Sequence, residues 1–179
     1  MTSAHPRLEL RLPRLDEEAE VLRAHRAASP SNPTFLHYYR EGMEFAAYLH
    51  VLHEQQRGEN LPTPEHVPSS FLFAFDGVCI VGRVSLRHRL APTRGQAYGH
   101  IGYAVTPEFR NRGYATAMLA QALRIAHDDL HIASVLVTCD EDNAASIKVI
   151  ERNGGRFDGL VDALFLAKPK RRYWFDAAG

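Results

Sequence analysis

The spacing of apolar residues changes along the chain, and each change marks a predicted element. Alternation of apolar and polar residues is typical of a half-buried strand, whereas recurrence at every third or fourth position is typical of a helix with one buried face. A short continuous apolar run indicates a strand buried on both sides of a sheet. These patterns predict strands at 8–12, 71–75, 78–86, 100–106, 132–138, 161–166 and 172–175, and helices at 16–28, 42–56, 115–127 and 143–153.

Turn and breaker residues separate these elements and indicate the fold class. The pair Asp76-Gly77 predicts a tight hairpin between two strands, and Gly154-Gly155 ends the last helix. Three prolines over 57–69 exclude a long helix or a central strand, so this stretch is predicted to be a surface loop. The order β-α-α-β-β-β-α-β-α-β-β predicts an α+β fold, in which helices flank one mixed central β-sheet.

Length and composition predict a single domain over 1–179. The 179 residues suffice for one sizeable core, and 21 basic residues balance 21 acidic ones, which offers no support for a nucleic-acid partner. No apolar run is long enough to cross a membrane, and the first residues lack the apolar core of a secretory signal. We therefore expect a cytoplasmic protein in which Cys79 and Cys139, both in predicted strands, are buried thiols.

One segment carries the candidate chemistry, namely the loop between the strand that ends at Val105 and the helix that begins near Ala115. Free N–H groups and the dipole at a helix N-terminus attract anions. Gly113 lets the backbone approach an anion closely, and Arg110 and Arg112 add positive charge. The segment lacks the Gly-Lys-Ser/Thr ending of a nucleoside-triphosphate loop and the three-glycine dinucleotide fingerprint. These residues alone predict a phosphate or pyrophosphate site.

Two signatures resemble those of the GCN5-related N-acetyltransferase (GNAT) superfamily. Residues 102–115 run from a strand through Val-x-Pro to Arg-x-x-Gly-x-Ala at a helix start, which resembles the acetyl-CoA motif of that superfamily. Residues 143–154 resemble its second signature, Asn-x-x-(Ala/Ser) leading to Glu-Lys-x-Gly. The resemblance implies a GNAT-like fold with a CoA-binding core at about 71–175, roofed over the acceptor site by the helical segment and Pro-rich loop of 13–69. Shorter stretches resemble a bacterial branch of predicted acetyltransferases whose substrate is undefined.

The resemblance also implies which residues bind acetyl-CoA, the expected cosubstrate. Val105 would pair its backbone with the pantetheine arm, along a strand splayed from its neighbour at 132–138, and an N–H near it would stabilise the oxyanion. Asn143 would contact the pantetheine amides or act as a plain helix N-cap, and Ser146 follows on the same face. The backbone amides expected to hold the pyrophosphate belong to Arg110, Asn111, Arg112, Gly113, Tyr114 and Ala115.

Transfer to an amine needs a base, because an ammonium group has no lone pair for attack. His100 is the first candidate, since many relatives carry a glutamate at this position three residues before Tyr103; in the alternative, His100 only packs or hydrogen-bonds on its strand. Glu108 is the second candidate. His88 is a third, or it binds a substrate carboxylate together with Arg87, and Tyr103 is assigned to the acceptor side as well. No metal is expected, because the histidine pair on the second predicted helix has no third ligand.

The second signature departs from the family pattern at Ile150, where many relatives carry a tyrosine that protonates the leaving thiolate. The expected function is an acyl-CoA-dependent N-acyltransferase that moves an acetyl group to a primary amine of a small-molecule or peptide acceptor by direct attack. The alternatives are a non-catalytic acyl-CoA-binding or sensing module, which Ile150 favours, and a nucleotide- or phosphate-binding protein unrelated to CoA. Homodimers are common in the superfamily, although no seam in the sequence identifies one.

Overall fold

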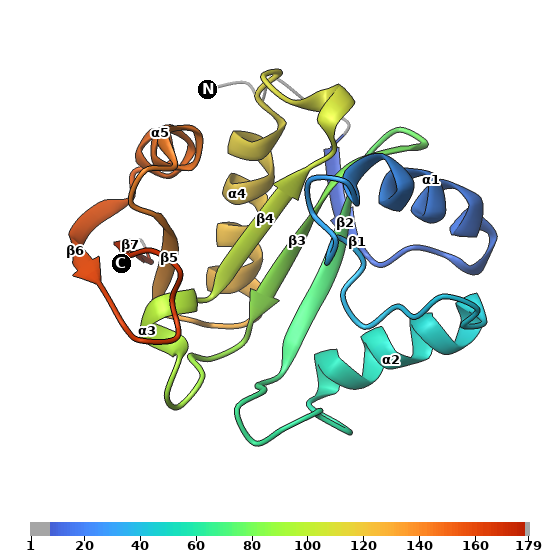
Figure 1. Ribbon diagram of the computed structural model, residues 1–179, viewed down its shortest axis with the longest axis horizontal. Coiled ribbons are helices and arrows are strands. Elements are labelled where there is room, and N and C mark those ends of the chain that lie inside the picture. The colour runs from blue at the N-terminus through green and yellow to red at the C-terminus, as the bar shows by residue number, and fades with distance from the viewer. Residues whose placement is uncertain (1–7, 178–179) are drawn as a thin grey trace.

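A mixed seven-stranded sheet forms the centre of the computed structural model, which describes residues 8–177 (Figure 1). Its strand order is β1-β2-β3-β4-β5-β7-β6. The neighbours β4 and β5 are parallel, and the other neighbouring strands of the sheet are antiparallel. The α+β fold and the mixed sheet are therefore confirmed. The strands are β1 (Leu8–Arg11), β2 (Ser69–Asp76), β3 (Cys79–Arg87), β4 (Ile101–Val105), β5 (Ser134–Asp140), β6 (Arg156–Val161) and β7 (Lys170–Asp176), and the helices are α1 (Glu18–Ala28), α2 (Phe45–Arg57), the short α3 (Gly95–Tyr98), α4 (Tyr114–Arg124) and α5 (Ala144–Arg152).

The sheet separates two apolar cores. On one face, Met118 and Leu119 of α4 pack with Val84 of β3, and all three side chains are fully buried. On the other face, the buried side chains of Tyr48 and Leu52 in α2 belong to a cluster formed with α1 and the phenylalanines of β2. Because side chains alternate along a strand, β3 and β4 contribute to both faces, and this alternation decides which of their residues face which helices.

The sheet opens between its two central strands. β4 and β5 pair through a single position, Ile101 with Val137, after which β4 continues along β3 alone and β5 continues along β7 alone. In Figure 1 the two strands diverge beside α4. Consequently one edge of β4 lacks a partner strand in the middle of the sheet, which matches the splay that the family resemblance implies.

The structure corrects three expectations. The strand predicted at 161–166 is wrong: β6 spans Arg156–Val161, where it pairs with β7, and the following segment is a loop with an exposed Leu164. The ladder with β7 is formed by residues 156–161, whereas the apolar side chains of Leu164 and Phe165 lie at the surface and are not packed in the core that would hold them as a strand. A short helix, α3, was not predicted before β4. Both cysteines are free, but only Cys139 is buried, since Cys79 lies exposed at the start of β3. Among the described residues, no helix is long and apolar enough to span a membrane.

Candidate functional site

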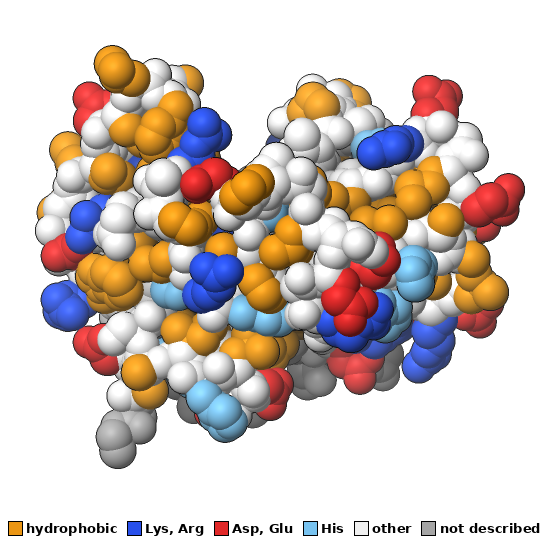
Figure 2. Space-filling view, turned by 90° about the horizontal axis from the view of Figure 1, so that it is seen from below, with side chains coloured by type: hydrophobic (Ala, Val, Ile, Leu, Met, Phe, Trp, Pro, Cys, Tyr) orange, Lys and Arg blue, Asp and Glu red, His pale blue; other side chains and the backbone are white. Residues whose placement is uncertain are grey.

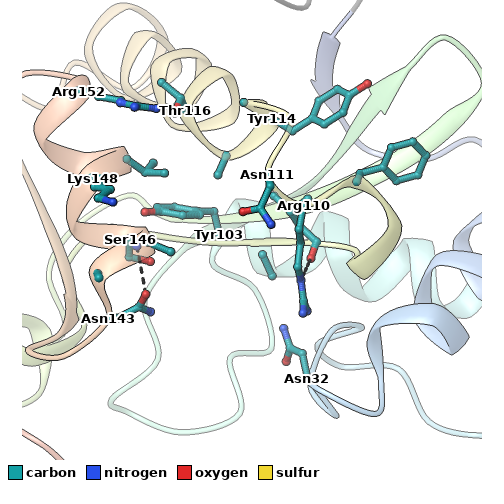
Figure 3. A pocket seen from close by; sticks show the side chains of 18 of the residues that line it. Asn32, Tyr103, Arg110, Asn111, Tyr114, Thr116, Asn143, Ser146, Lys148 and Arg152 are labelled. Carbon is teal, nitrogen blue, oxygen red and sulfur yellow. Dashed lines mark hydrogen bonds between the residues drawn. The ribbon is translucent and has the colours of Figure 1, made fainter.

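A cleft of about 840 Å³ lies where β4 and β5 separate, between α4 and α5 (Figure 3). It brings together residues far apart in the sequence: the end of β4, the loop before α4, the first turn of α5, and Ser31 and Asn32 from the segment that joins α1 to α2. The residues predicted from sequence that line it are Tyr103, Val105, Arg110, Asn111, Gly113, Tyr114, Ala115, Asn143 and Ser146.

The N-terminus of α4 opens into this cleft. Gly113 is its N-cap in a left-handed conformation (φ 84°), no side chain caps the helix, and Asn111 is also left-handed (φ 60°). The helical hydrogen-bond ladder begins with the Ala117 N–H, which donates to the Gly113 carbonyl at 3.2 Å. The N–H groups of a first helical turn have no acceptor within the helix, so this end of α4 offers free donors and a favourable dipole to an anion.

The side chains of the loop divide between the cleft and its surroundings. Arg110 donates to the Val105 carbonyl at 3.3 Å and to the Ser31 hydroxyl at 2.8 Å, so it connects β4 to the segment after α1. Arg112 lies over the ring of Phe109, and the Tyr114 hydroxyl donates to Asp76 at 2.5 Å. Arg112 is not among the residues that line the cleft, and the Tyr114 ring points away from it (Figure 3), so neither side chain contributes a group to the cleft.

α5 contributes two cations that the sequence analysis missed. Lys148 and Arg152 line the cleft one helical turn apart (Figure 3), opposite the N-terminus of α4. The sequence contained a signal for these residues: Ala144, Lys148 and Arg152 are each four residues apart, so they lie on one face of the predicted helix. Asn143 is the N-cap of α5, since its side-chain oxygen accepts from the Ser146 N–H at 3.1 Å.

His100 holds the sheet together at the base of the opening. His100 is buried, and its backbone N–H donates to the Leu136 carbonyl at 2.7 Å. Its ring nitrogen Nδ1 accepts from the backbone N–H of Leu136 at 2.9 Å. Burial is the main cause that lowers the pKa of His100 to about 4, and the positive charge of Arg87 acts in the same direction. The hydrogen bond with Leu136 raises the pKa by a smaller amount. The ring is therefore neutral, and the nitrogen that carries its lone pair already accepts a backbone hydrogen bond across the two strands.

The other predicted proton-transfer groups lie outside the cleft. Glu108 forms an ion pair with Arg23 at 2.5 Å; burial tends to raise the pKa of Glu108, but a backbone hydrogen bond and Arg23 bring it below its usual value. His88 shares a hydrogen bond of 2.9 Å with Ser70, and burial lowers its pKa. Neither residue lines the cleft, and no Asp, Glu or His does so in the described part of the chain.

Tyr103 takes a different place from the one expected. Its ring lies in the cleft between β4 and α5 (Figure 3), and its buried hydroxyl has no hydrogen-bond partner among the described residues, since Ser146 lies beside it but outside hydrogen-bond geometry. Burial raises the pKa of this hydroxyl to about 12, against a smaller lowering effect of Ser146. Ile150 is fully buried in the core, so the side chain at that position does not reach the cleft.

A family model described as "Acetyltransferase (GNAT) domain" matches residues 7–156, most of the chain. The chain belongs to the GNAT acetyltransferase family. Among curated proteins it is 24% identical over 101 residues to the uncharacterized N-acetyltransferase YnaD of Bacillus subtilis (strain 168), covering 56% of this chain and 55% of that protein. It is 26% identical over 102 residues to the L-amino acid N-acetyltransferase AaaT of Escherichia coli (strain K12), covering 51% and 62%. The matches therefore span less than two thirds of either relative.

Solved structures share the whole GNAT fold. The microcin C7 self-immunity acetyltransferase MccE, in complex with acetyl-CoA and AMP, superposes with a TM-score of 0.68 at 16% identity, covering 97% of this chain and 94% of that one. RimL, a ribosomal L7/L12 alpha-N-protein acetyltransferase in complex with CoA, superposes with a TM-score of 0.65 at 20% identity, covering 94% and 93%. At these identities the likeness shows the fold.

A second cavity of this GNAT domain, about 400 Å³ in volume, lies on the α1/α2 side of the sheet. Arg87 lines it, as do His37 and Tyr38 from the segment before α2. The ring of His37 stacks on Phe71 with centroids 6.0 Å apart and makes no hydrogen bond to a described residue. No cluster of three potential metal ligands occurs among residues 8–177.

The two hydrogen bonds of His100 predict a structural role that can be measured. His100→Ala should lower the free energy of unfolding by about 1–3 kcal/mol, because the buried Leu136 N–H loses its acceptor. His100→Asn should recover much of this loss, since its side-chain oxygen can take the place of Nδ1. Urea unfolding of the three proteins measures the difference, and equal losses for Ala and Asn would show that the ring contributes packing alone.

The lowered pKa also predicts the pH dependence. The unfolded chain binds a proton at His100 near pH 6.5, whereas the folded protein binds it only near pH 4. The contribution of His100 to stability is thus present above about pH 6.5 and lost as the pH falls toward 4. In His100→Asn this part of the pH dependence should disappear.

Proposed function

We propose that this chain transfers an acetyl group from acetyl-CoA to a primary amine, by direct attack of the amine on the thioester. The observation that carries the proposal is the shape of the cleft, which runs from an unpaired edge of β4 to the N-terminus of α4 and the cations of α5. A strand edge suits the amides of a pantetheine arm, and a helix N-terminus flanked by cations suits phosphates. Both ends of acetyl-CoA therefore find matching groups.

The cosubstrate would be held chiefly by backbone groups. The amides of Arg110 to Ala115 would receive the pyrophosphate, and Lys148 and Arg152 would supply charge from the opposite wall. Thr106 donates its N–H to Val81, on the β3 side, at 2.9 Å. Because successive residues of a strand direct their backbone groups to opposite sides, the N–H of Val105 faces the open edge, where it would stabilise negative charge on the thioester oxygen.

The base would come from the α1/α2 side of the sheet, and we propose His37 for this role. Burial lowers the pKa of His37, and Arg83 and Arg87 lower it further, so its imidazole is neutral at physiological pH and able to accept a proton. His100 and Glu108 are less suited, because one is already hydrogen-bonded to Leu136 and the other is paired with Arg23.

The leaving thiolate needs a proton, and we propose Tyr103 as its donor. Its buried hydroxyl lies in the cleft without a partner, and its raised pKa keeps it protonated at physiological pH. Ser146 would return a proton to Tyr103 from solvent. In this arrangement β4 supplies the hydroxyl that many relatives carry at the position of Ile150.

Binding of acetyl-CoA tests the first step. Acetyl-CoA should raise the melting temperature, whereas ATP and NAD should not, because a ligand stabilises only the fold that binds it. The double variant Lys148→Gln/Arg152→Gln should weaken acetyl-CoA binding about tenfold and reduce its salt dependence, since both charges are exposed and screened. The control is Arg124→Gln at the other end of α4. A shift with ATP but none with acetyl-CoA would sink the proposal.

Turnover tests the proton donor. Tyr103→Phe should lower kcat roughly 100-fold, the usual contribution of general acid catalysis, with little change in acetyl-CoA affinity. Tyr114→Phe is the matched control: it loses a hydrogen bond to Asp76 and some stability, but it should keep its turnover. Thiol release on a panel of amines measures both. Tight acetyl-CoA binding without release on any amine would favour the non-catalytic binding module that Ile150 suggests.

The pH–rate profile tests the base. Activity should be lost as the pH falls below the usual histidine range, because His37 must be neutral to accept a proton and its pKa is lowered. His37→Gln should lower kcat/KM about 100-fold and remove that acidic limb. His66→Gln provides the comparison, since His66 lines the same cavity but is hydrogen-bonded to Thr63 at 2.8 Å. Equal effects of both substitutions would refute the assignment to His37.

A further inference from the structure

Two arginines on β3 have no carboxylate partner within the described part of the chain. Arg83 and Arg87 lie on the same face of the strand, toward α1 and α2, because their positions differ by an even number. Among residues 8–177, no Asp or Glu lies within ion-pair distance of either, whereas Arg11, Arg23 and Arg57 each pair with a glutamate.

Their neighbours do not replace the missing counterion. Arg83 lies over the ring of Phe71 at 5.1 Å, and its Nε is buried without a hydrogen bond, as is the hydroxyl of Tyr48. Among residues 8–177, Arg87 donates to the carbonyls of Tyr98 and Gly99, at 3.4 and 3.3 Å. The carboxylate of Glu65, which lines the same cavity, instead accepts from the Thr93 hydroxyl at 2.6 Å. Burial lowers the pKa of Arg83 to about 10 and lowers that of Arg87 as well.

Such an arrangement is costly for a protein on its own. A cation withdrawn from water is unfavourable unless an anion or several hydrogen bonds compensate it. Two such cations, four residues apart on one face of β3 with Ser85 between them, therefore indicate that an anion from outside the chain completes the site. A guanidinium suits this task, because its fork of N–H donors matches the oxygens of a carboxylate or a phosphate.

The location of the arginines connects them to the acetyl-CoA cleft. Arg87 and Ser85 line the second cavity, Ser85 pairs with Gly102 of β4, and Arg83 pairs with Ala104, which lines the cleft. A Cβ at Gly102 would meet nothing within 4 Å, so β4 is open at this position, which lies two residues, about 7 Å, from Ala104 along the strand. Figure 2 shows the surface hollowed between the half with β5–β7 and the half with α1 and α2.

We propose that the acceptor is a small amine carrying an anionic oxygen group, a carboxylate or a phosphate, which Arg87 and Arg83 bind while its amino group lies over Gly102. This inference rests on the proposed acetyl transfer. In that reaction the neutral amine nitrogen forms a bond to the acetyl carbon, the carbon–sulfur bond breaks, the surplus amine proton leaves to the base, and the sulfur takes a proton from the donor. The arginines bind the far end of the acceptor and exchange no proton.

Matched amine pairs test the proposal. One arm compares β-alanine with β-alaninamide, and the other compares O-phosphoethanolamine with ethanolamine, so that the responding arm identifies carboxylate or phosphate. At saturating acetyl-CoA, kcat/KM should be about tenfold or more higher for the anionic member of one pair, the scale of hydrogen bonds to a charged group.

Substitution of the arginines gives the second readout. Arg87→Met should abolish the preference, raise KM for the anionic amine about tenfold and leave acetyl-CoA affinity unchanged. Its melting temperature should equal or exceed that of the wild type, because a purely structural arginine would instead destabilise the fold when removed. Arg83→Met carries the same expectation and serves if Arg87→Met does not fold. Arg89→Met, an exposed arginine two residues beyond Arg87, is the matched control and should keep the preference.

Calorimetric titration of the same amines into the CoA-bound protein separates this inference from the proposed function. If the anionic amine binds in an Arg87-dependent way but releases no free thiol when acetyl-CoA is supplied, the anion site is supported and the transfer reaction is overturned. Equal kcat/KM within both pairs, or a preference that survives Arg87→Met, would overturn the anion site and leave the transfer reaction standing. Neither binding nor release with any of the four amines would overturn both.

Discussion

The single pairing between β4 and β5 is the constraint on which the rest of the structure depends. Backbone N–H and C=O groups withdrawn from water must find partners, and a strand in the middle of a sheet normally finds them in both neighbours. Here β4 has a complete partner only in β3, so one of its edges remains available to a ligand. His100 limits the opening, because its two bonds to Leu136 join the strands just before they separate. The cleft is thus a gap in an otherwise continuous hydrogen-bonded sheet.

In the proposed transfer, the same opening would let two substrates meet from opposite faces of the sheet. The α4 and α5 side presents a helix N-terminus with Lys148 and Arg152, while the α1 and α2 side presents the arginines of β3. The chain is neutral overall, yet many of its carboxylates pair with cations elsewhere, so these cations would be available to external anions. Net charge therefore describes the partners of this protein poorly, because the relevant positive charge is local and partly buried.

The fold and the loop that lines the cleft could be predicted from the sequence, because both depend on local patterns. The strand before Pro107, the helix that begins shortly after Gly113 and Asn143 as a helix N-cap are features that neighbouring residues specify. The surroundings of the site's side chains depend on long-range packing, which local sequence patterns do not reveal. Nothing near His100 indicates that Leu136 occupies its Nδ1, and Arg83 appears as one polar position of an alternating strand. Likewise β6 was misplaced, since its register follows β7 rather than its own apolar residues.

The position of Ile150 shows why a missing family residue need not mean a missing activity. The tyrosine that many relatives carry is missing from one helix only. A proton donor needs to reach the leaving thiolate in the cleft, and any element that borders the cleft can supply it. Ile150 is enclosed in the core, so restoring a polar group there would bury it against the apolar side chains of α4 and the sheet. Tyr103 already places a protonated hydroxyl in the cleft from β4, at the strand edge that would hold the thioester. An unpartnered buried hydroxyl costs stability wherever it occurs, and its persistence beside the open edge is most simply explained by the reaction that it would serve.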